Sequence, residues 1–181
     1  RDFLGAELRY RGWERHEPFA YALWQRDQNH EEVRTLFQKF EYDSNHVGIG
    51  STGQLSERWR YETEWVYESG SSYGDHRWYR PNDIDAWAID NLVEYLFPGK
   101  HRARASFEYL VASGDGTRRL SPTDSRGGNQ FDFQDNSFVA FGYKDTGLSF
   151  APRYGNVHMW RAGGSLYPWP ENNALRYLEL G

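Results

Sequence analysis

Residues 58–68, which read RWRYETEWVYE, constrain the fold of this chain more than any other stretch. Aromatic side chains occupy alternate positions from Trp59 to Tyr67, with Thr63 completing the row. The positions between them carry mostly Arg and Glu. Because successive side chains of a β-strand point to opposite faces, this alternation predicts a strand with one aromatic face and one charged face.

The composition of the whole chain fits a sheet with these two faces. Its 181 residues include 8 Trp and 13 Tyr, yet the mean hydropathy is −0.90. A β-structure with an aromatic outer surface and a polar interior needs both properties. No run of apolar residues is long enough for a transmembrane helix, and the absence of Cys excludes disulfides and thiolate chemistry. The net charge of −5 does not indicate a general nucleic-acid binder.

The two-residue period recurs along the chain and predicts a series of strands. Turn signals such as Glu17-Pro18 and Pro98-Gly99-Lys100 separate them. The apolar residues of 30–40 have helical spacing, so a helical turn there stays open as an alternative. The predicted strands cover 5–16, 19–27, 37–53, 58–68, 84–97, 101–113, 155–167 and 174–181, with a short strand at 138–143.

The connections between these strands alternate in length. Those near 17, 55, 99 and 170 are short, and those near 30, 76 and 134 are long. A transmembrane barrel has short periplasmic turns and long extracellular loops, whereas a soluble sandwich has no reason for such alternation. We therefore predict an all-β chain forming one domain over 1–181, a portion of about eight strands of an antiparallel transmembrane β-barrel. The chain begins at Arg1 and ends within the last predicted strand, so we expect this barrel domain to be incomplete.

Several motifs follow one another in a characteristic order and spacing between about 40 and 181. They are GQLSERWRYETEWVYESG (53–70), DIDAWAID (83–90), FEYLVASGD (107–115), Phe131-Asp132-Phe133 and NVHMWRAGGSLYP (156–168). Together they resemble the alginate export family of bacterial outer-membrane β-barrel proteins. The resemblance implies that the chain is the later part of a larger barrel, whose missing strands belong to the full gene product.

The resemblance also implies a function and a location. These are a porin-like channel in the outer membrane of a Gram-negative-type bacterium, and passive export or diffusion of an anionic polysaccharide such as alginate or of smaller anionic solutes. The implied partners are outer-membrane lipid, the polysaccharide and periplasmic export components, with no nucleic acid and no cofactor. The long loops at 69–83 and 114–154 would act as a gate over the pore.

The charged faces of the predicted strands are the candidate lining of the conduit. Arg suits a uronate polymer because its planar guanidinium binds a carboxylate at two points and stays charged. The alternative is that Arg and Glu merely neutralise one another across neighbouring strands, as in the polar interior of any large barrel. The predicted lining residues are Arg58, Arg60, Glu62, Glu64, Arg102, Arg104, Glu108 and Arg161, with Arg9, Arg11, Asp90 and Glu94 on the same faces. The five Arg residues of the first group lie in segments that match the family.

The aromatic faces are the candidate contact with lipid and with its headgroup boundary. Alternatively, the same residues form the core of a soluble sandwich. Asn91 falls on the aromatic face, which requires either a shift of register or a polar neighbour that binds it. The predicted lipid-facing aromatics are Trp59, Tyr61, Trp65, Tyr67, Trp87, Tyr95, Phe107 and Tyr109.

Acidic residues in the long loop give a weak indication of a calcium site, because calcium takes several oxygen ligands. Asp115 and Asp132 are the first candidates, followed by Asp124 and Asp135, although their spacing matches no EF-hand. No other metal site is predicted, since the six His residues are scattered.

Two other functions stay open beside the channel. One is a soluble secreted carbohydrate-binding β-sandwich that stacks its aromatics on sugars, and the other is a small barrel with a structural or adhesive role. Enzymatic activity is not predicted. Glu62 and Glu64 are a carboxylate pair of the kind that glycosidases use, but simple alternation already places such acids on every charged face.

Overall fold

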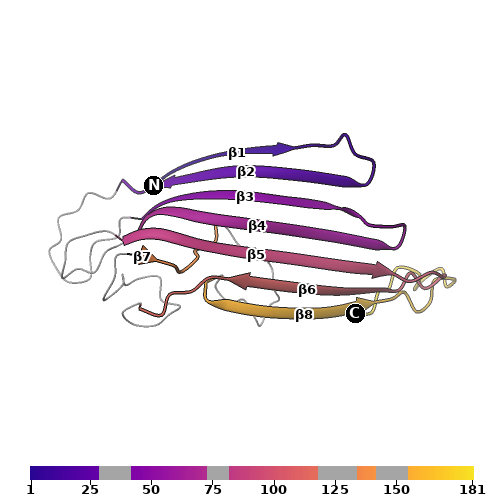
Figure 1. Ribbon diagram of the computed structural model, residues 1–181. Coiled ribbons are helices and arrows are strands. Elements are labelled where there is room, and N and C mark those ends of the chain that lie inside the picture. The colour runs from indigo at the N-terminus through magenta and orange to yellow at the C-terminus, as the bar shows by residue number, and fades with distance from the viewer. Residues whose placement is uncertain (29–41, 73–81, 118–133, 142–154) are drawn as a thin grey trace.

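The computed structural model describes residues 1–28, 42–72, 82–117, 134–141 and 155–181, and every helix or strand assigned in these ranges is a strand. Eight strands form one sheet. All except β7 run antiparallel to their neighbours in chain order, and the two-residue β7 pairs in parallel with β5 (Figure 1). The strands are β1 (Asp2–Arg9), β2 (His16–Arg26), β3 (Asp43–Gln54), β4 (Trp59–Ser72), β5 (Asn82–Leu96), β6 (Arg104–Ala112), β7 (Gln134–Asp135) and β8 (Val157–Ser165).

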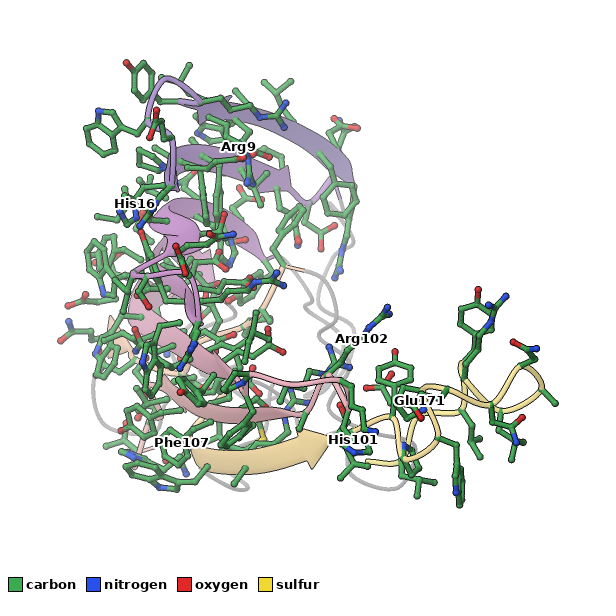
Figure 2. All side chains as sticks on the ribbon, turned by 90° about the vertical axis from the view of Figure 1, so that its right-hand side faces the viewer. Arg9, His16, His101, Arg102, Phe107 and Glu171 are labelled. Carbon is green, nitrogen blue, oxygen red and sulfur yellow. The ribbon has the colours of Figure 1, made fainter. Side chains whose placement is uncertain are left out.

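The sheet curves but does not close. β1 and β8 are its two edges and do not pair with each other. Seen along the strands, the ribbon bends into an arc, whose inner side we call the concave face and whose outer side we call the convex face (Figure 2). The predicted all-β antiparallel architecture is therefore confirmed, and within the described residues this portion of the sheet is not closed into a barrel.

Short connections lie at one end of the sheet, and the strands that the long connections join meet the opposite end, as the alternation predicted. Residues 10–15, 55–58 and 97–103 join strands at what we call the turn end. β2, β4 and β6 end, and β3, β5 and β8 begin, at the opposite end, which we call the loop end (Figure 1). In the third short turn Gly99 has a φ of 123°, a conformation that side chains other than glycine rarely adopt.

Two predicted strand boundaries are wrong because backbone groups find other partners. Glu17-Pro18 is not a corner but lies within β2. Its Pro18 is opposite Ser51 of β3, and its carbonyl accepts the N–H of Tyr10 at 2.9 Å. Residues 174–181 form turns and one isolated bridge instead of a strand. The Asn172 side-chain oxygen accepts the N–H groups of Ala174 and Leu175, which holds this stretch in a turn.

The predicted short strand at 138–143 is also wrong over its described part, 138–141. The short strand lies earlier, at β7, and the backbone N–H of Val139 binds the side chain of Glu68 instead of a neighbouring strand. The possible helical turn at 30–40 lies outside the described residues. Within those residues, no helix is long and apolar enough to cross a membrane.

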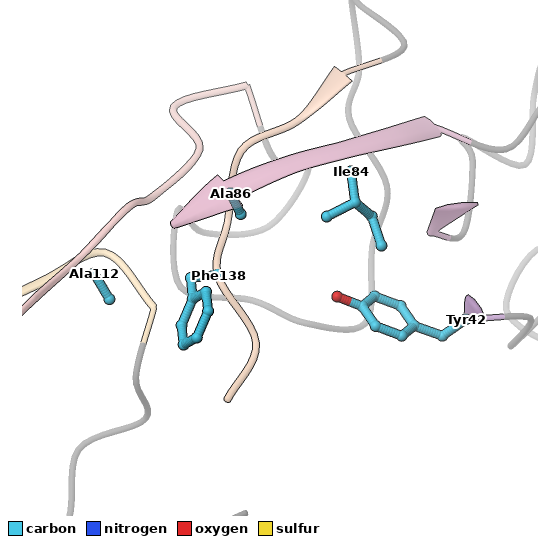
Figure 3. Packing of buried hydrophobic residues seen from close by; sticks show 5 residues of the cluster. All are labelled: Tyr42, Ile84, Ala86, Ala112 and Phe138. Atoms are coloured by element: carbon cyan, nitrogen blue, oxygen red, sulfur yellow. The ribbon is translucent and has the colours of Figure 1, made fainter. Parts of the chain in front are cut away.

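The buried hydrophobic cluster lies on the concave face close to the loop end. Ile84 and Ala86 of β5 pack there with Tyr42, Ala112 and Phe138 (Figure 3). Phe138 comes from the segment that follows β7, so this cluster fastens that segment onto the sheet. The concave face is therefore covered and partly apolar toward the loop end.

Candidate functional site: the charged concave face

Cross-strand register brings most of the predicted lining residues onto one face. Arg60 is opposite Glu94, and Glu108 is opposite Arg161. Figure 2 shows Arg9 on the inner side of the arc and Phe107 on the outer side. The concave face carries Arg60, Glu62 and Glu64 of β4, Arg104 and Glu108 of β6 and Arg161 of β8, together with Arg9, Asp90 and Glu94.

Three of the predicted residues lie in turns instead of on a strand face. Arg58 precedes β4, Arg102 lies between β5 and β6, and Arg11 follows β1. Arg102 has a φ of 46°, and its guanidinium lies 6.0 Å from the centre of the Tyr167 ring. These strand assignments were wrong because the charge alternation continues past the point where the chain turns.

A chain of ion pairs crosses the concave face near the turn end. The carboxylate of Glu94 lies 3.9 Å from Arg60 on one side and 3.6 Å from Arg104 on the other. Arg104 continues the chain to Glu179 at 2.8 Å. On the neighbouring row, Arg161 contacts Glu108 at 2.5 Å. Arginines and carboxylates therefore alternate across β4, β5, β6 and β8.

The paired charges of β4, β5, β6 and β8 differ in their exposure, whereas Glu62 of the same face is exposed and, at the β1 edge, Glu7 is 53% exposed beside Arg9 at 33%. The side chains of Arg60, Arg104 and Arg161 are 53%, 49% and 44% exposed, whereas those of Glu94 and Glu108 are 20% and 2% exposed. The carboxylates lie against the sheet and the guanidiniums extend beyond them. This part of the concave face presents cationic groups to solvent even though each is paired.

Arg9 extends the charged face to the first edge of the sheet. Its guanidinium lies 4.9 Å from the centre of the Phe19 ring and 3.1 Å from Glu7. On the next strands, the Tyr21 hydroxyl donates to Glu64. The aromatic side chains of β2 thus share the concave face with charges, a placement that the sequence analysis left unassigned.

A buried polar group that was not predicted lies nearer the loop end. Glu68 of β4 is opposite His46 of β3, and both side chains are buried. The Glu68 carboxylate accepts the hydroxyl of Tyr42 at 2.5 Å and the backbone N–H of Val139 at 2.7 Å. Glu68 continues the charge alternation of 58–68, which was a usable signal, whereas nothing in the sequence shows that a distant segment covers it.

The predicted lipid-facing aromatics all share the convex face. Register places Trp59 opposite Tyr95 and Tyr67 opposite Trp87. The first pair lies near the turn end of β4, and the second pair lies nearer its loop end. The same face carries Tyr61 and Trp65 of β4 and Phe107 and Tyr109 of β6. The common face is confirmed, and contact with lipid stays a prediction.

Polar side chains on the convex face bind one another. Thr63 donates its hydroxyl to the Asn91 side-chain oxygen at 2.7 Å, which explains Asn91 on this face without a shift of register. The Tyr61 hydroxyl lies 2.8 Å from Ser51 Oγ and 2.9 Å from His16 Nδ1. Such pairing removes the cost of placing polar atoms on an apolar surface.

Trp160 of β8 is a further convex aromatic that the sequence analysis did not select. Its ring centre lies 4.3 Å from that of Tyr109 and 5.8 Å from that of Phe107. The alternation of His158, Trp160 and Ala162 was the available signal.

The calcium prediction gains no support from the described residues. The two carboxylate oxygens of Asp115 accept hydrogen bonds from Thr117 and from the backbone N–H of Asn136. Asp135 accepts the backbone N–H of Ser137, and Asp124 and Asp132 lie outside the described residues. In the described ranges, no group of three or more His, Cys, Asp and Glu residues could hold a metal ion.

Residues 166–181, which we call the tail, are fixed at the turn end by exposed ionic groups. Hydrogen bonds from Ser165 and then from Tyr167 lower the pKa of the Glu179 carboxyl, and the bond to Glu179 raises the pKa of Tyr167. A hydrogen bond from Lys100 lowers the pKa of Glu171. Glu179 therefore attaches the tail to Ser165 and Arg104, and Glu171 attaches it to the turn at Lys100. The bond between Tyr167 and Glu179, by contrast, lies within the tail.

Comparison with known proteins gives one match. A family model described as Alginate export matches residues 1–178. Neither the curated proteins nor the solved structures contain a significant match to this chain.

Proposed function

This chain belongs to the Alginate export family, and on that premise we propose that it forms part of the wall of an outer-membrane channel for an anionic polysaccharide. The family is one of transport proteins, not of enzymes. In the proposed arrangement the concave face lines a water-filled passage and the convex face contacts lipid. The chain acts by providing a closed wall and a charged lining, without any chemical reaction.

The exposure of Arg60, Arg104 and Arg161 above less exposed carboxylates is the observation that carries this proposal. Exposed guanidiniums bind the carboxylates of a uronate polymer, and the less exposed acids that pair with them keep each site from holding the polymer too tightly. Arg rings in pores favour anions, whereas exposed acidic rings would favour cations. Smaller anionic solutes would pass by the same means.

The opposite face supports the same arrangement. Its aromatic side chains, among them Trp59, Trp87 and Trp160, are exposed although they are large and apolar. Aromatic girdles at both membrane boundaries are typical of outer-membrane barrels. A sandwich would cover such a face with a second sheet, and the described residues form a single sheet.

The two free edges require further strands in the assembled wall. Unpaired backbone groups of β1 and β8 would be too costly in a bilayer, so we propose that other strands pair with both. The mutual backbone bonds of Leu166 and Leu180, at 2.8 and 2.9 Å, already return the chain to the free side of β8. This bridge supports the proposal that further strands pair with β8.

The experiment is single-channel recording of the complete gene product in planar bilayers. We expect an open channel that prefers anions and is blocked by uronate oligomers. Arg60→Gln and Arg104→Gln should weaken both the anion preference and the block, because each removes an exposed guanidinium. Lys100→Gln, in a turn outside the concave face, is the matched control.

The proposal fails if the product is a soluble monomer without detergent, does not change its gel migration on boiling, and does not conduct. It also fails if a conducting channel prefers cations and ignores uronates.

A further inference from the structure

Residues 136–141 cross the concave face toward its loop end, and we call this segment the strap. It leaves the sheet after β7, which extends alongside the end of β5. The backbone N–H of Phe138 donates to the Ser113 carbonyl at 3.2 Å, next to the end of β6. The Phe138 side chain then packs on Ile84 and Ala86 of β5 (Figure 3). The strap therefore starts at the β5 and β6 side of the arc.

The middle of the strap is held by two side chains from adjacent strands. The carboxylate of Glu68 on β4 accepts the N–H of Val139 at 2.7 Å. A ring nitrogen of His46 on β3 lies 2.9 Å from the Val139 carbonyl oxygen. Both polar backbone groups of one residue are thus satisfied by the register pair Glu68 and His46. This is a specific attachment, in contrast to the nonspecific packing of apolar side chains.

The last described residue of the strap reaches the other side of the arc. The ring of Phe141 lies 5.5 Å from His46 of β3 and 5.5 Å from Phe3 of β1, edge to face in both cases. Contacts along six residues therefore extend from β6 to β1. The strap spans the concave face from one side of the sheet to the other.

Holding the strap with Glu68 requires the burial of a charged carboxylate, which is energetically costly. Its carboxylate is completely buried, and a buried charge is tolerated only when several donors surround it. Apolar side chains of the same size would fix the strap with less cost, so the carboxylate serves the position and orientation of the strap more than the stability of the fold.

The geometry points to a role that rests on the proposed channel function. We propose that the strap is a fixed constriction of the conduit, latched by Glu68, which sets the largest cross-section that can pass. The strap exposes Phe141, while Val139 and Ala140 are partly buried against the cluster, and none of the three is charged. A polyanion thus meets its cationic partners in the charged part of the passage and only an uncharged restriction here.

The experiment compares the complete gene product with Glu68→Ala in planar bilayers, and the readouts are the single-channel conductance and the polyethylene glycol size that still enters. We expect conductance to rise by about twofold and the size limit to increase, since pore width governs both. Val139→Pro removes the same N–H from the strap without altering the sheet and should have the same effect. Tyr67→Phe is the matched control, because it removes one hydrogen bond, to Asp85, at the adjacent position on the convex face.

A change of gel migration on boiling verifies that each variant is folded. The strap proposal is overturned if folded Glu68→Ala or Val139→Pro channels keep the conductance and size limit of the unaltered protein. If Glu68→Ala does not fold, Val139→Pro decides. Absence of conductance in the unaltered protein would instead overturn the proposed function itself, so the two failures are distinguishable.

Discussion

The two ends of the concave face differ in whether their charged side chains are exposed or buried, although β4 runs through both ends. Near the turn end, Arg60 of β4 is half exposed and belongs to a chain of ion pairs. Eight residues later, Glu68 of the same strand is completely buried beneath the strap. Alternation alone places the side chains of Arg60 and Glu68 on the same, concave face. The segment that lies over the strand decides whether a charge there is exposed to the passage or used to fix structure.

The two halves of the concave face therefore have different proposed roles in the conduit. The turn half, represented by Arg60, Glu94 and Arg104, offers exposed cations with flexible side chains, which suits repeated weak binding. The loop half, represented by His46 and Glu68, is covered by the strap and hydrogen-bonded to it, which suits a fixed dimension. Substitutions in the two halves should therefore have different consequences, with large effects on stability wherever a carboxylate or ring is buried.

The largest effect is expected where the turn half contains a buried acid. Arg161→Ala removes the cation that lies 2.5 Å from the Glu108 carboxylate, whose side chain is 2% exposed. The free energy of unfolding should fall by about 3 kcal/mol, because removing a close cation from a buried carboxylate is strongly destabilising. Urea titration of the complete gene product in lipid vesicles measures it. Arg60→Ala, whose partner Glu94 keeps Arg104, should cost less than about 1 kcal/mol. Equal losses for both would mean that burial does not separate these pairs.

A slightly smaller effect is expected in the loop half. Phe138→Ala removes a buried ring from the cluster that fastens the strap, which should cost about 3 kcal/mol or somewhat less if the strap relaxes. Phe141→Ala is the matched variant, since its ring is exposed and should cost about 1 kcal/mol or less. The same urea titration compares the two. A loss for Phe141→Ala as large as that for Phe138→Ala would contradict the assignment of the anchor.

The smallest effect concerns the tail and its titrating groups. Glu179 and Glu171 have lowered pKa values, so their stabilising contribution is present above the usual carboxyl pKa and is lost as pH falls through the lowered values. Tyr167 has a raised pKa, so its contribution is present below the usual tyrosine pKa and is lost as pH rises through the raised value. The tail should be held best between about pH 5 and pH 10.

A nitroxide attached through Asn173→Cys reports tail mobility, and the chain has no other Cys. Mobility should increase at both extremes of pH. Lys100→Ala should increase it slightly at neutral pH, and an unchanged spectrum across the whole range would contradict the ionic attachment.

The strand alternation and the two faces were predictable from the sequence because both depend on local patterns. Alternate residues from Trp59 to Tyr67 form the convex face of β4, and the register places Tyr95 and Trp87 of β5 opposite the first and the last of them. The short turns at one end were predictable for the same reason. Arg58 and Arg102 were misassigned because charge alternation gives no sign of where a strand stops.

The strap could not be predicted because it depends on contacts between distant segments. The alternation in 138–141 suggests a strand, but the N–H of Val139 finds a carboxylate 71 residues away in the chain. The strand predicted at 174–181 was also wrong. The side chain of Asn172 accepts hydrogen bonds from local backbone N–H groups, which in a strand would have been available to pair with a neighbouring strand.

The most direct test of the central claim, that the sheet separates water from lipid, uses two adjacent residues of β6. Ala105 lies on the convex face and Ser106 on the concave face. Single Cys variants of the complete gene product, Ala105→Cys and Ser106→Cys, are reconstituted in vesicles and treated with a charged, membrane-impermeant maleimide. We predict that the Cys at 106 reacts at least roughly tenfold faster, because only that face meets water. Equal rates, or faster reaction at 105, would contradict the assignment of the two faces.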